Sequence, residues 1–200
     1  MSEQGSAEWL AERAGRVTAS ALSNVMMAKT AAGFQNYMAQ LVCERLTGQP
    51  AETFKSAAME HGNETEPQAR AFYELETANE VTEVGFIAHP SIEWSGASPD
   101  GLIGDDGLIE IKCPQPAKHI KNLTAGSIDK AYILQMQWQM ECTGRTWCDF
   151  VSFNPSFPEH LKMQITRVDA DPKLQAELRD KVTDFVQQVQ DKLAELEARA

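Results

Sequence analysis

Apolar residues in the first part of the chain recur every three or four positions, which is the spacing of helices with one buried face. The pattern predicts helices over residues 6–13, from an N-cap at Thr18 to about Lys29, from Phe34 to Leu46, and from about Glu64 to Thr77. Gly48 is placed to end the third helix, and Pro67 would lie in the first turn of the fourth.

After residue 80 the apolar and polar residues alternate, which is typical of strands. Strands are predicted over residues 80–89, 91–103, 107–114, 146–153 and 160–168, with a further helix over residues 127–142. This order favours an α/β or α+β fold with a central mixed sheet of about five strands flanked by helices.

A long final helix is predicted from Pro172 to the end of the chain, with apolar residues at helical spacing from Leu174 to Leu196. The length of 200 residues suits one domain over residues 1–200. Helix 172–200 would pack on the body of this domain or, alternatively, on a neighbouring subunit.

Composition and charge narrow the class of protein. Hydrophobic residues make up 42% of the chain, which is enough for a core, and no apolar run approaches the roughly 18 residues of a membrane span. The first residues lack the basic and apolar segments of a signal peptide, so we expect a soluble intracellular protein.

The net charge of −11 argues against an overall basic surface for nucleic acid, although a metal ion can neutralise an acidic site locally. The four cysteines lack the spacing of zinc or iron–sulfur ligands and are expected to be reduced thiols.

The segment SPDGLIGDDGLIEIKCP has the pattern of a hairpin whose turn is GDDG. Glu110 and Lys112 share one face of its second strand, because side chains two residues apart in a strand point to the same side. A two-residue turn would place Asp100 opposite Ile111, whereas a three-residue loop places it opposite Glu110. We predict the longer loop, with Gly107 in its left-handed position, or a break at Asp100, because only then do the two carboxylates converge.

Two converging carboxylates form an oxygen-rich site suited to Mg²⁺ or Mn²⁺, and the backbone carbonyl of Ile111 can add a ligand. A metal ion there would neutralise charge on a phosphodiester and lower the pKa of a bound water. Lys112 would orient that water, and it would act as a base only if its pKa fell well below about 10.4. The spacing alone leaves a second interpretation open, a surface hairpin with an ion pair between Glu110 and Lys112.

Four segments of the chain, in the same order, resemble a known nuclease family. They are EWLAERAGRVTAS at residues 8–20, HGNETEPQAR at residues 61–70, the S-P-D-G and E-I-K-C-P pair that contains Asp100 and Glu110, and AYILQMQWQM at residues 131–140. The pair resembles the signature of the PD-(D/E)xK nucleases. Together the segments resemble the phage lambda exonuclease branch, also called YqaJ-type viral recombinases, over residues 8 to about 153.

This resemblance implies a restriction-endonuclease-like core and a Mg²⁺-dependent 5′→3′ exonuclease, with Mn²⁺ as a substitute and two ions per site. Such an enzyme degrades one strand of linear double-stranded DNA to mononucleotides and leaves a 3′ single strand for annealing-type recombination. The resemblance also implies a ring-shaped homotrimer at DNA ends, a single-strand annealing recombinase protein as partner, and a phage or prophage protein in the cytoplasm of a bacterial host.

The resemblance also assigns roles to residues at matching positions. Asp100, Glu110, the Ile111 carbonyl and Glu66 would bind metal, and Lys112 would position the attacking water. The terminal 5′ phosphate would be held by Arg13, Ser20, Ser98 and Gln135, which offer a guanidinium fork with hydroxyl and amide donors. Trp9 matches an aromatic residue near the DNA entrance, and Gln137 matches a further position in contact with DNA.

Taken one at a time, these residues also have structural interpretations. Glu66 in a first helical turn would stabilise the helix dipole, and Trp9 would pack in the core. The remaining interpretations are an ion pair for Arg13, a helix cap for Ser20, a turn hydroxyl for Ser98 and an exposed helix position for Gln135. Two other functions also remain open. An endonuclease or junction resolvase with the same fold would cut closed circular DNA, and a degenerate fold would hold DNA ends without cutting them.

Overall fold

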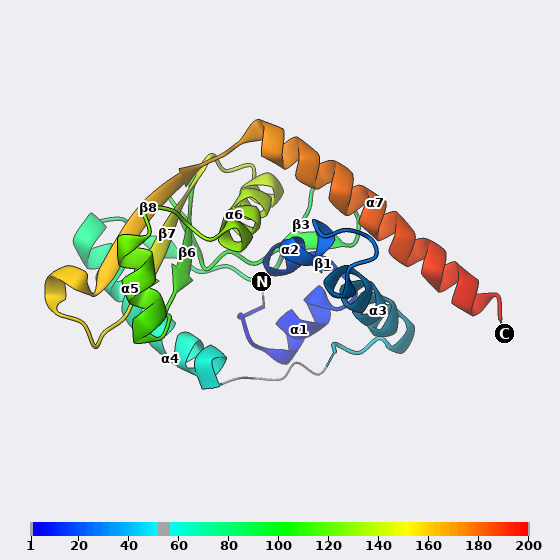
Figure 1. The fold of residues 1–200 in the computed structure, drawn as a ribbon, viewed down its shortest axis with the longest axis horizontal. Helices are drawn as coiled ribbons and strands as arrows, with labels where there is room; N and C mark the ends of the chain where they lie inside the picture. Colours follow the sequence, from blue (N-terminus) through cyan, green and yellow to red (C-terminus); the bar gives the residue numbers. More distant parts are fainter. Residues whose placement is uncertain (1, 52–56, 200) are drawn as a thin grey trace.

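A five-stranded sheet has the order β2-β5-β6-β7-β8, and Figure 1 labels its strands β6, β7 and β8. Strands β6 and β7 are parallel and the other neighbours are antiparallel, so the sheet is mixed, as the sequence predicts. The strands are β2 Val81–Thr82, β5 Gly101–Ile103, β6 Gly107–Lys112, β7 Trp147–Phe153 and β8 Met163–Asp169. The computed structural model describes residues 2–51 and 57–199, except the side chains of residues 57–59.

A smaller sheet has the order β1-β4-β3. Its strands are β1 Val17–Thr18, β3 Ile87–Ala88 and β4 Ser95–Ala97. Two predicted strands are therefore divided between the sheets, because residues 80–89 form β2 and β3, and residues 91–103 form β4 and β5. The second division falls at Pro99, which has no backbone N–H to donate to a sheet.

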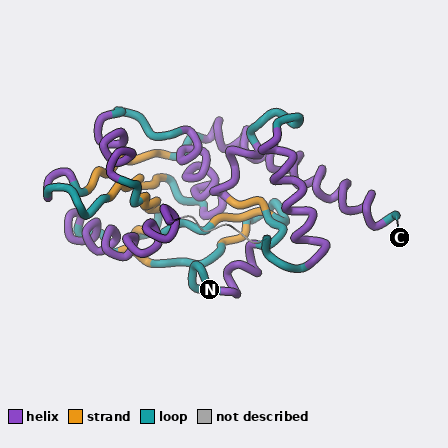
Figure 2. The backbone as a smooth tube through the Cα atoms, turned by 60° about the horizontal axis from the view of Figure 1, so that its bottom comes forward, coloured by secondary structure: helices purple, strands orange, loops and turns teal. Residues whose placement is uncertain are grey.

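Helices lie on both sides of the strands (Figure 2). They are α1 Ala7–Arg13, α2 Leu22–Val25, α3 Ala32–Thr47, α4 Ala57–Thr77, α5 Pro116–Thr124, α6 Lys130–Thr143 and α7 Pro172–Glu197, with short 3₁₀ helices η1 Ala19–Ala21 and η2 Glu159–Leu161. Tyr73 of α4 packs in one buried cluster with Ile109, and Met136 of α6 packs in another with Leu108. The alternation along β6 thus directs Leu108 and Glu110 toward α6 and Ile109 toward α4.

Helix boundaries depart from the predictions in several places. The second predicted helix ends at Val25 instead of about Lys29, whereas the third ends as expected at Gly48, which is left-handed with φ +65°. The fourth begins at Ala57, about two turns earlier than predicted, so Pro67 lies inside the helix and not in its first turn. Helix α5 has no counterpart among the predicted elements, because its nine residues are fewer than the window of about 11 in which a helical period is recognised.

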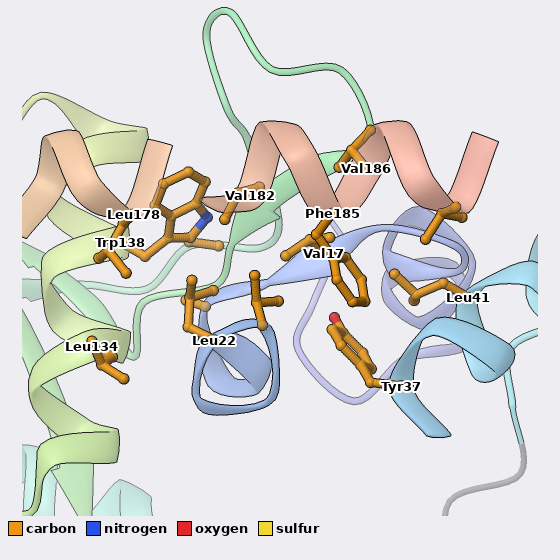
Figure 3. Close-up of a cluster of buried hydrophobic side chains, with 14 of the residues drawn as sticks. Val17, Leu22, Tyr37, Leu41, Leu134, Trp138, Leu178, Val182, Phe185 and Val186 are labelled. Carbon is orange, nitrogen blue, oxygen red and sulfur yellow. The ribbon is translucent and has the colours of Figure 1, made fainter. Parts of the chain in front are cut away.

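The apolar stripe of α7 packs on the N-terminal part of the chain (Figure 3). Phe185 is fully buried, lies edge-on to Phe34 at 4.8 Å between ring centroids and stacks on Tyr37 at 5.5 Å. The same cluster includes Leu22 and, from α6, Trp138. Helix α7 therefore joins the N-terminal helices to α6, while its C-terminal end extends past α3 (Figure 1).

The β5–β6 hairpin has the register that the sequence analysis predicts. Ile103 pairs with Gly107, so residues 104–106 form a three-residue loop. Continuing this antiparallel register by one residue beyond β5 places Asp100 across from Glu110. The longer loop is therefore confirmed, and its register places Asp100 next to Glu110.

The residue that makes this loop possible is Gly104, whose φ is +51°, and the prediction that Gly107 is left-handed is wrong. Gly107 lies within β6 against Trp147, where an added Cβ would come within 2.1 Å of the indole ring. Arg145 closes the hairpin, because its Nη1 lies 2.7 to 3.1 Å from the carbonyl oxygens of Ile103, Gly104 and Gly107.

Replacing Arg145 by methionine is expected to destabilise the protein by about 1.5–3 kcal/mol, because charged hydrogen bonds to the hairpin carbonyls are lost. Urea unfolding followed by circular dichroism measures the change. Lys192→Met, which removes an exposed ion pair on α7, is the control and should change stability by less than about 1 kcal/mol. Equal unfolding midpoints for Arg145→Met and the wild type would show that the hydrogen bonds of Arg145 do not stabilise the protein.

Candidate active site

Asp100 lies where β4 and β5 separate, and its carboxylate points back to β6. Its Oδ2 accepts a hydrogen bond from the backbone N–H of Ile111 at 2.7 Å. Burial raises the pKa of the Asp100 carboxyl well above its usual range, and the nearby Glu110 carboxylate raises it further. A positive charge between the two acids would lower the pKa of Asp100 again. Two neighbouring acids of this kind therefore favour the binding of a cation.

Glu110 is fully buried, and three side chains satisfy its carboxylate. Oε1 accepts a hydrogen bond from Gln135 Nε2 at 2.7 Å and forms an ion pair with Lys112. Oε2 accepts a hydrogen bond from Gln139 Nε2 at 2.6 Å. Gln135 and Gln139 are one turn apart on α6, so both reach the same strand. A buried carboxylate without such partners would be strongly destabilising.

Lys112 is the cation of this cluster. Burial alone lowers the pKa of its ammonium, but the carboxylates of Glu110 and Asp100 outweigh that effect and raise the pKa above its ordinary value. In this structure Lys112 is therefore the cationic partner of Glu110, and its pKa is raised and not lowered as a general base would need. The ring of Tyr132 lies 5.5 Å from its Nζ and covers one side of it.

A cavity of about 480 Å³ opens above these groups. It is lined by nearly all the residues that the sequence analysis selects: Trp9, Arg13, Ser20, Glu66, Ser98, Asp100, Ile111, Lys112 and Gln135. Glu110 lies beneath its wall, in contact with the lining residues Lys112 and Gln135. The fold thus brings together residues from α1, η1, α4, β6 and α6 that are far apart in the sequence.

Helix α1 and Ser98 also line the cavity. Trp9 Nε1 and Arg13 Nη1 both donate to the Ser98 hydroxyl oxygen, at 3.0 and 3.2 Å. The Arg13 guanidinium carbon lies 4.0 Å from the centroid of the Trp9 ring, which holds the group over the cavity. Ser20 Oγ lies 3.4 Å from the Thr18 hydroxyl. The core position considered for Trp9 is not observed, because this side chain lines the cavity.

Glu66 lies in the middle of α4 and not in a first turn, because the helix starts at Ala57. Its Oε1 accepts a hydrogen bond from Arg70 Nη2 at 2.9 Å, in an ion pair one helical turn long. Burial raises the pKa of the Glu66 carboxyl, and Arg70 and Lys112 oppose that shift. The interpretation of Glu66 as a residue that stabilises a helix N-terminus is therefore wrong.

Gln137 does not reach the cavity. It is 2% exposed, its Nε2 donates to the carbonyl of Asp169, and its Oε1 accepts from the backbone N–H of Asp171. It lies two residues from Gln135 on α6, so it points to the opposite side of the helix. The structure gives no support to a DNA contact of Gln137, and this side chain holds the connection between β8 and α7.

The donor set fits a hard divalent cation of the Mg²⁺ type. Among the described residues, no three His, Cys, Asp or Glu side chains are grouped as metal ligands in this structure, and the role of Glu66 at the metal stays a prediction. Mg²⁺ is commonly bound by one or two carboxylates, with water and substrate phosphate as the other ligands, and two acids meet that need. All four cysteines are free, and burial raises the pKa of the Cys113 thiol at the cavity wall to about 12. Cys113 is therefore a thiol in this structure and does not compete with the carboxylates for the cation.

Sequence analysis overlooked Gln139 and Tyr132 as members of this site. The signal for Gln139 is its spacing of four residues from Gln135 on a predicted helix, which puts the two amides on one face. Tyr132 lines the cavity and stacks on Phe150 at 5.4 Å between ring centroids. Tyr132 carries no pattern that separates it from an ordinary helix position.

Comparison with known proteins decides the family. The model of the YqaJ-like viral recombinase domain matches residues 8–146. The chain belongs to this family. A curated relative of the YqaJ-like chain, the uncharacterized protein R354 of Acanthamoeba polyphaga mimivirus, is 30% identical over 165 residues, which cover 74% of this chain and 29% of that protein. The chain thus spans less than a third of the length of this relative.

Solved structures give the same fold. LHK-Exo, an alkaline exonuclease from Laribacter hongkongensis, is 48% identical and superposes with a TM-score of 0.92 over 97% of each chain, and it has also been solved in complex with dAMP. A phage related exonuclease from Haemophilus somnus 129PT is 16% identical, with a TM-score of 0.74 over 91% of this chain and 96% of that one. The YqaJ-like chain therefore has an exonuclease fold. Within its described residues, no helix has the length and apolar character to cross a membrane.

Proposed function

We propose that this YqaJ-like chain is a metal-dependent deoxyribonuclease that degrades one strand of linear double-stranded DNA from its 5′ end. The observation that carries the proposal is one cavity lined by Asp100, Lys112, Arg13 and Ser98, with Glu110 paired to Lys112 and Arg13 bonded to Ser98. The 48% identity to an alkaline exonuclease over 97% of the chain supports a nuclease of the lambda exonuclease type.

Asp100, Glu110 and the Ile111 carbonyl would hold a divalent cation, which supplies positive charge to the phosphate and makes water more acidic. Lys112, whose pKa is raised while it pairs with Glu110, would donate a hydrogen bond to the attacking water and offset negative charge in the transition state. Its ammonium leaves Glu110 for that water when substrate is bound. Glu66 contacts the metal through water and not directly, because Arg70 already holds its carboxylate.

Arg13, Ser20, Ser98 and Gln135 bind the terminal 5′ phosphate in this proposal. The guanidinium of Arg13 is held over Trp9, and it offers the two parallel donors that phosphate oxygens accept. An anchored terminal phosphate sets a fixed distance to Asp100, so each cut releases one nucleotide. The acidic net charge of the chain is compatible with this role, because a cation bound by Asp100 and Glu110 would neutralise the acids locally and leave Arg13 to bind phosphate.

Digestion of linear duplex labelled at its 5′ or its 3′ ends tests the proposal. With Mg²⁺, the 5′ label is expected to appear first as mononucleotide, EDTA should stop the reaction, and a 5′-hydroxyl duplex should react about tenfold more slowly, because a charged hydrogen bond to the phosphate is lost. Covalently closed circular duplex is the control and should stay intact. Cutting of the circle would favour an endonuclease, and early release of the 3′ label would contradict the polarity.

The family relationship alone supports the remaining parts of the proposal. The metal would be Mg²⁺, with two ions per site, and Mn²⁺ could replace it. The chain would form a ring-shaped homotrimer around the DNA end. A single-strand annealing protein would receive the 3′ strand. The setting would be the cytoplasm of a bacterial host.

A further inference from the structure

The two carboxylate oxygens of Glu110 have different surroundings. Oε1 is contacted by Gln135 and Lys112, which both line the cavity. Oε2 accepts its side-chain hydrogen bond from Gln139, which does not line the cavity. One oxygen therefore faces the cavity and the other faces the buried interface between α6 and the sheet.

Gln139 occupies a position that suits an apolar residue. It is 0% exposed, and its helix neighbours Met136 and Met140 pack in a buried cluster with Leu108 and Phe150. Its side-chain oxygen has no hydrogen-bond partner among the described residues. A buried polar atom without a partner costs stability, and a methionine here would avoid that cost. The contact that accounts for the amide is its hydrogen bond to the metal-site acid.

We propose that Gln139 is a positioning residue of the metal site, which holds Oε2 of Glu110 so that Oε1 stays turned toward the cavity where a divalent cation binds. This inference rests on the proposed function. Gln135 and Lys112 approach Glu110 from the cavity and can release Oε1 to the cation. Gln139 is enclosed by the core, so it keeps its hold on Oε2 when the other two partners leave.

The test compares Gln139→Met with the wild type and with Met140→Leu, a control that changes the same helix face but removes no hydrogen bond to Glu110. Titration calorimetry with Mn²⁺ and no DNA is the first readout, and Gln139→Met is expected to bind Mn²⁺ about 10- to 100-fold more weakly. The second readout is the Mg²⁺ concentration for half-maximal cleavage of linear duplex. It should rise by a similar factor, while the rate at saturating Mg²⁺ recovers to near the wild-type value.

The outcomes separate this inference from the proposed function. Unchanged Mn²⁺ affinity in Gln139→Met, with a wild type that binds Mn²⁺ and degrades DNA, overturns the positioning role alone. A loss of rate that saturating Mg²⁺ does not recover overturns it as well, because damage to the helix would have that effect. A wild type that binds no Mn²⁺ overturns both proposals. If Gln139→Met does not fold, as judged by circular dichroism in EDTA, Gln139→Leu replaces it in the same comparison.

Discussion

Asp100→Asn is expected to reduce cleavage of linear duplex DNA by about a thousandfold or more, with the fold intact. Asparagine keeps the size of the side chain and an oxygen that can accept the hydrogen bond from the backbone of Ile111. The substitution therefore removes the negative charge needed for a cation and little else. Single-turnover digestion of 5′-phosphorylated duplex with Mg²⁺ measures the loss.

The same variant should be at least as stable as the wild type when EDTA is present. The pKa of the Asp100 carboxyl is raised in the folded protein, so its ionisation opposes folding increasingly as the pH rises above the ordinary carboxyl range. Asparagine has no charge to place beside Glu110, and thermal unfolding at pH 8 should show an equal or higher midpoint. Mg²⁺ should raise the midpoint of the wild type but not that of the variant.

The control for Asp100→Asn is Asp105→Asn, an exposed position in the loop of the same hairpin. It should leave both cleavage and metal stabilisation unchanged. Retention of more than about a tenth of the wild-type rate by Asp100→Asn would be incompatible with a role for this carboxylate in metal-dependent hydrolysis.

Lys112→Met is expected to lower the rate of cleavage by about 100- to 1,000-fold at saturating Mg²⁺, while metal binding persists. The ammonium is protonated and lies beside both acids, so its loss removes a donor to water and a positive charge near the phosphate. Single-turnover kinetics and Mn²⁺ titration of the same variant separate the chemical step from metal affinity.

Stability gives a second, independent readout for Lys112→Met. In EDTA the variant should unfold at a lower temperature, because the buried carboxylate of Glu110 loses its cationic partner. Mg²⁺ should restore much of that loss by taking the place of the ammonium. Lys162→Met is the matched control, since Lys162 has a similarly exposed side chain and an ion pair with Glu159, on the hairpin between β7 and β8. Near-normal cleavage by Lys112→Met would contradict the role assigned to this lysine.

The acidic hairpin could be predicted from the sequence because two local rules act on it. The alternation of side chains fixes the face of Glu110 and Lys112, and loop length fixes which residue lies opposite. The left-handed glycine cannot be assigned from the sequence because GDDG has a glycine at each end, and only the fold shows that Gly104 belongs to the loop and Gly107 to β6.

Contacts between distant segments could not be predicted from local pattern. Gln135, Gln137 and Gln139 alternate along one helix, and nothing in their spacing tells which face meets β6 and which meets the start of α7. The pairing of Glu66 with Arg70 depends on where α4 begins, and that start was placed about two turns too late. Resemblance to the family selected the cavity residues, whereas the hydrogen bonds that orient them came from the fold.

A crystal of the protein soaked in Mn²⁺, measured by anomalous scattering at the manganese edge, tests the central claim most directly. The account predicts an anomalous peak between the carboxylates of Asp100 and Glu110, next to Ile111, with Lys112 no longer paired to Glu110. The absence of a peak there at saturating Mn²⁺, with Glu110 still held by Lys112 and Gln135, would contradict it.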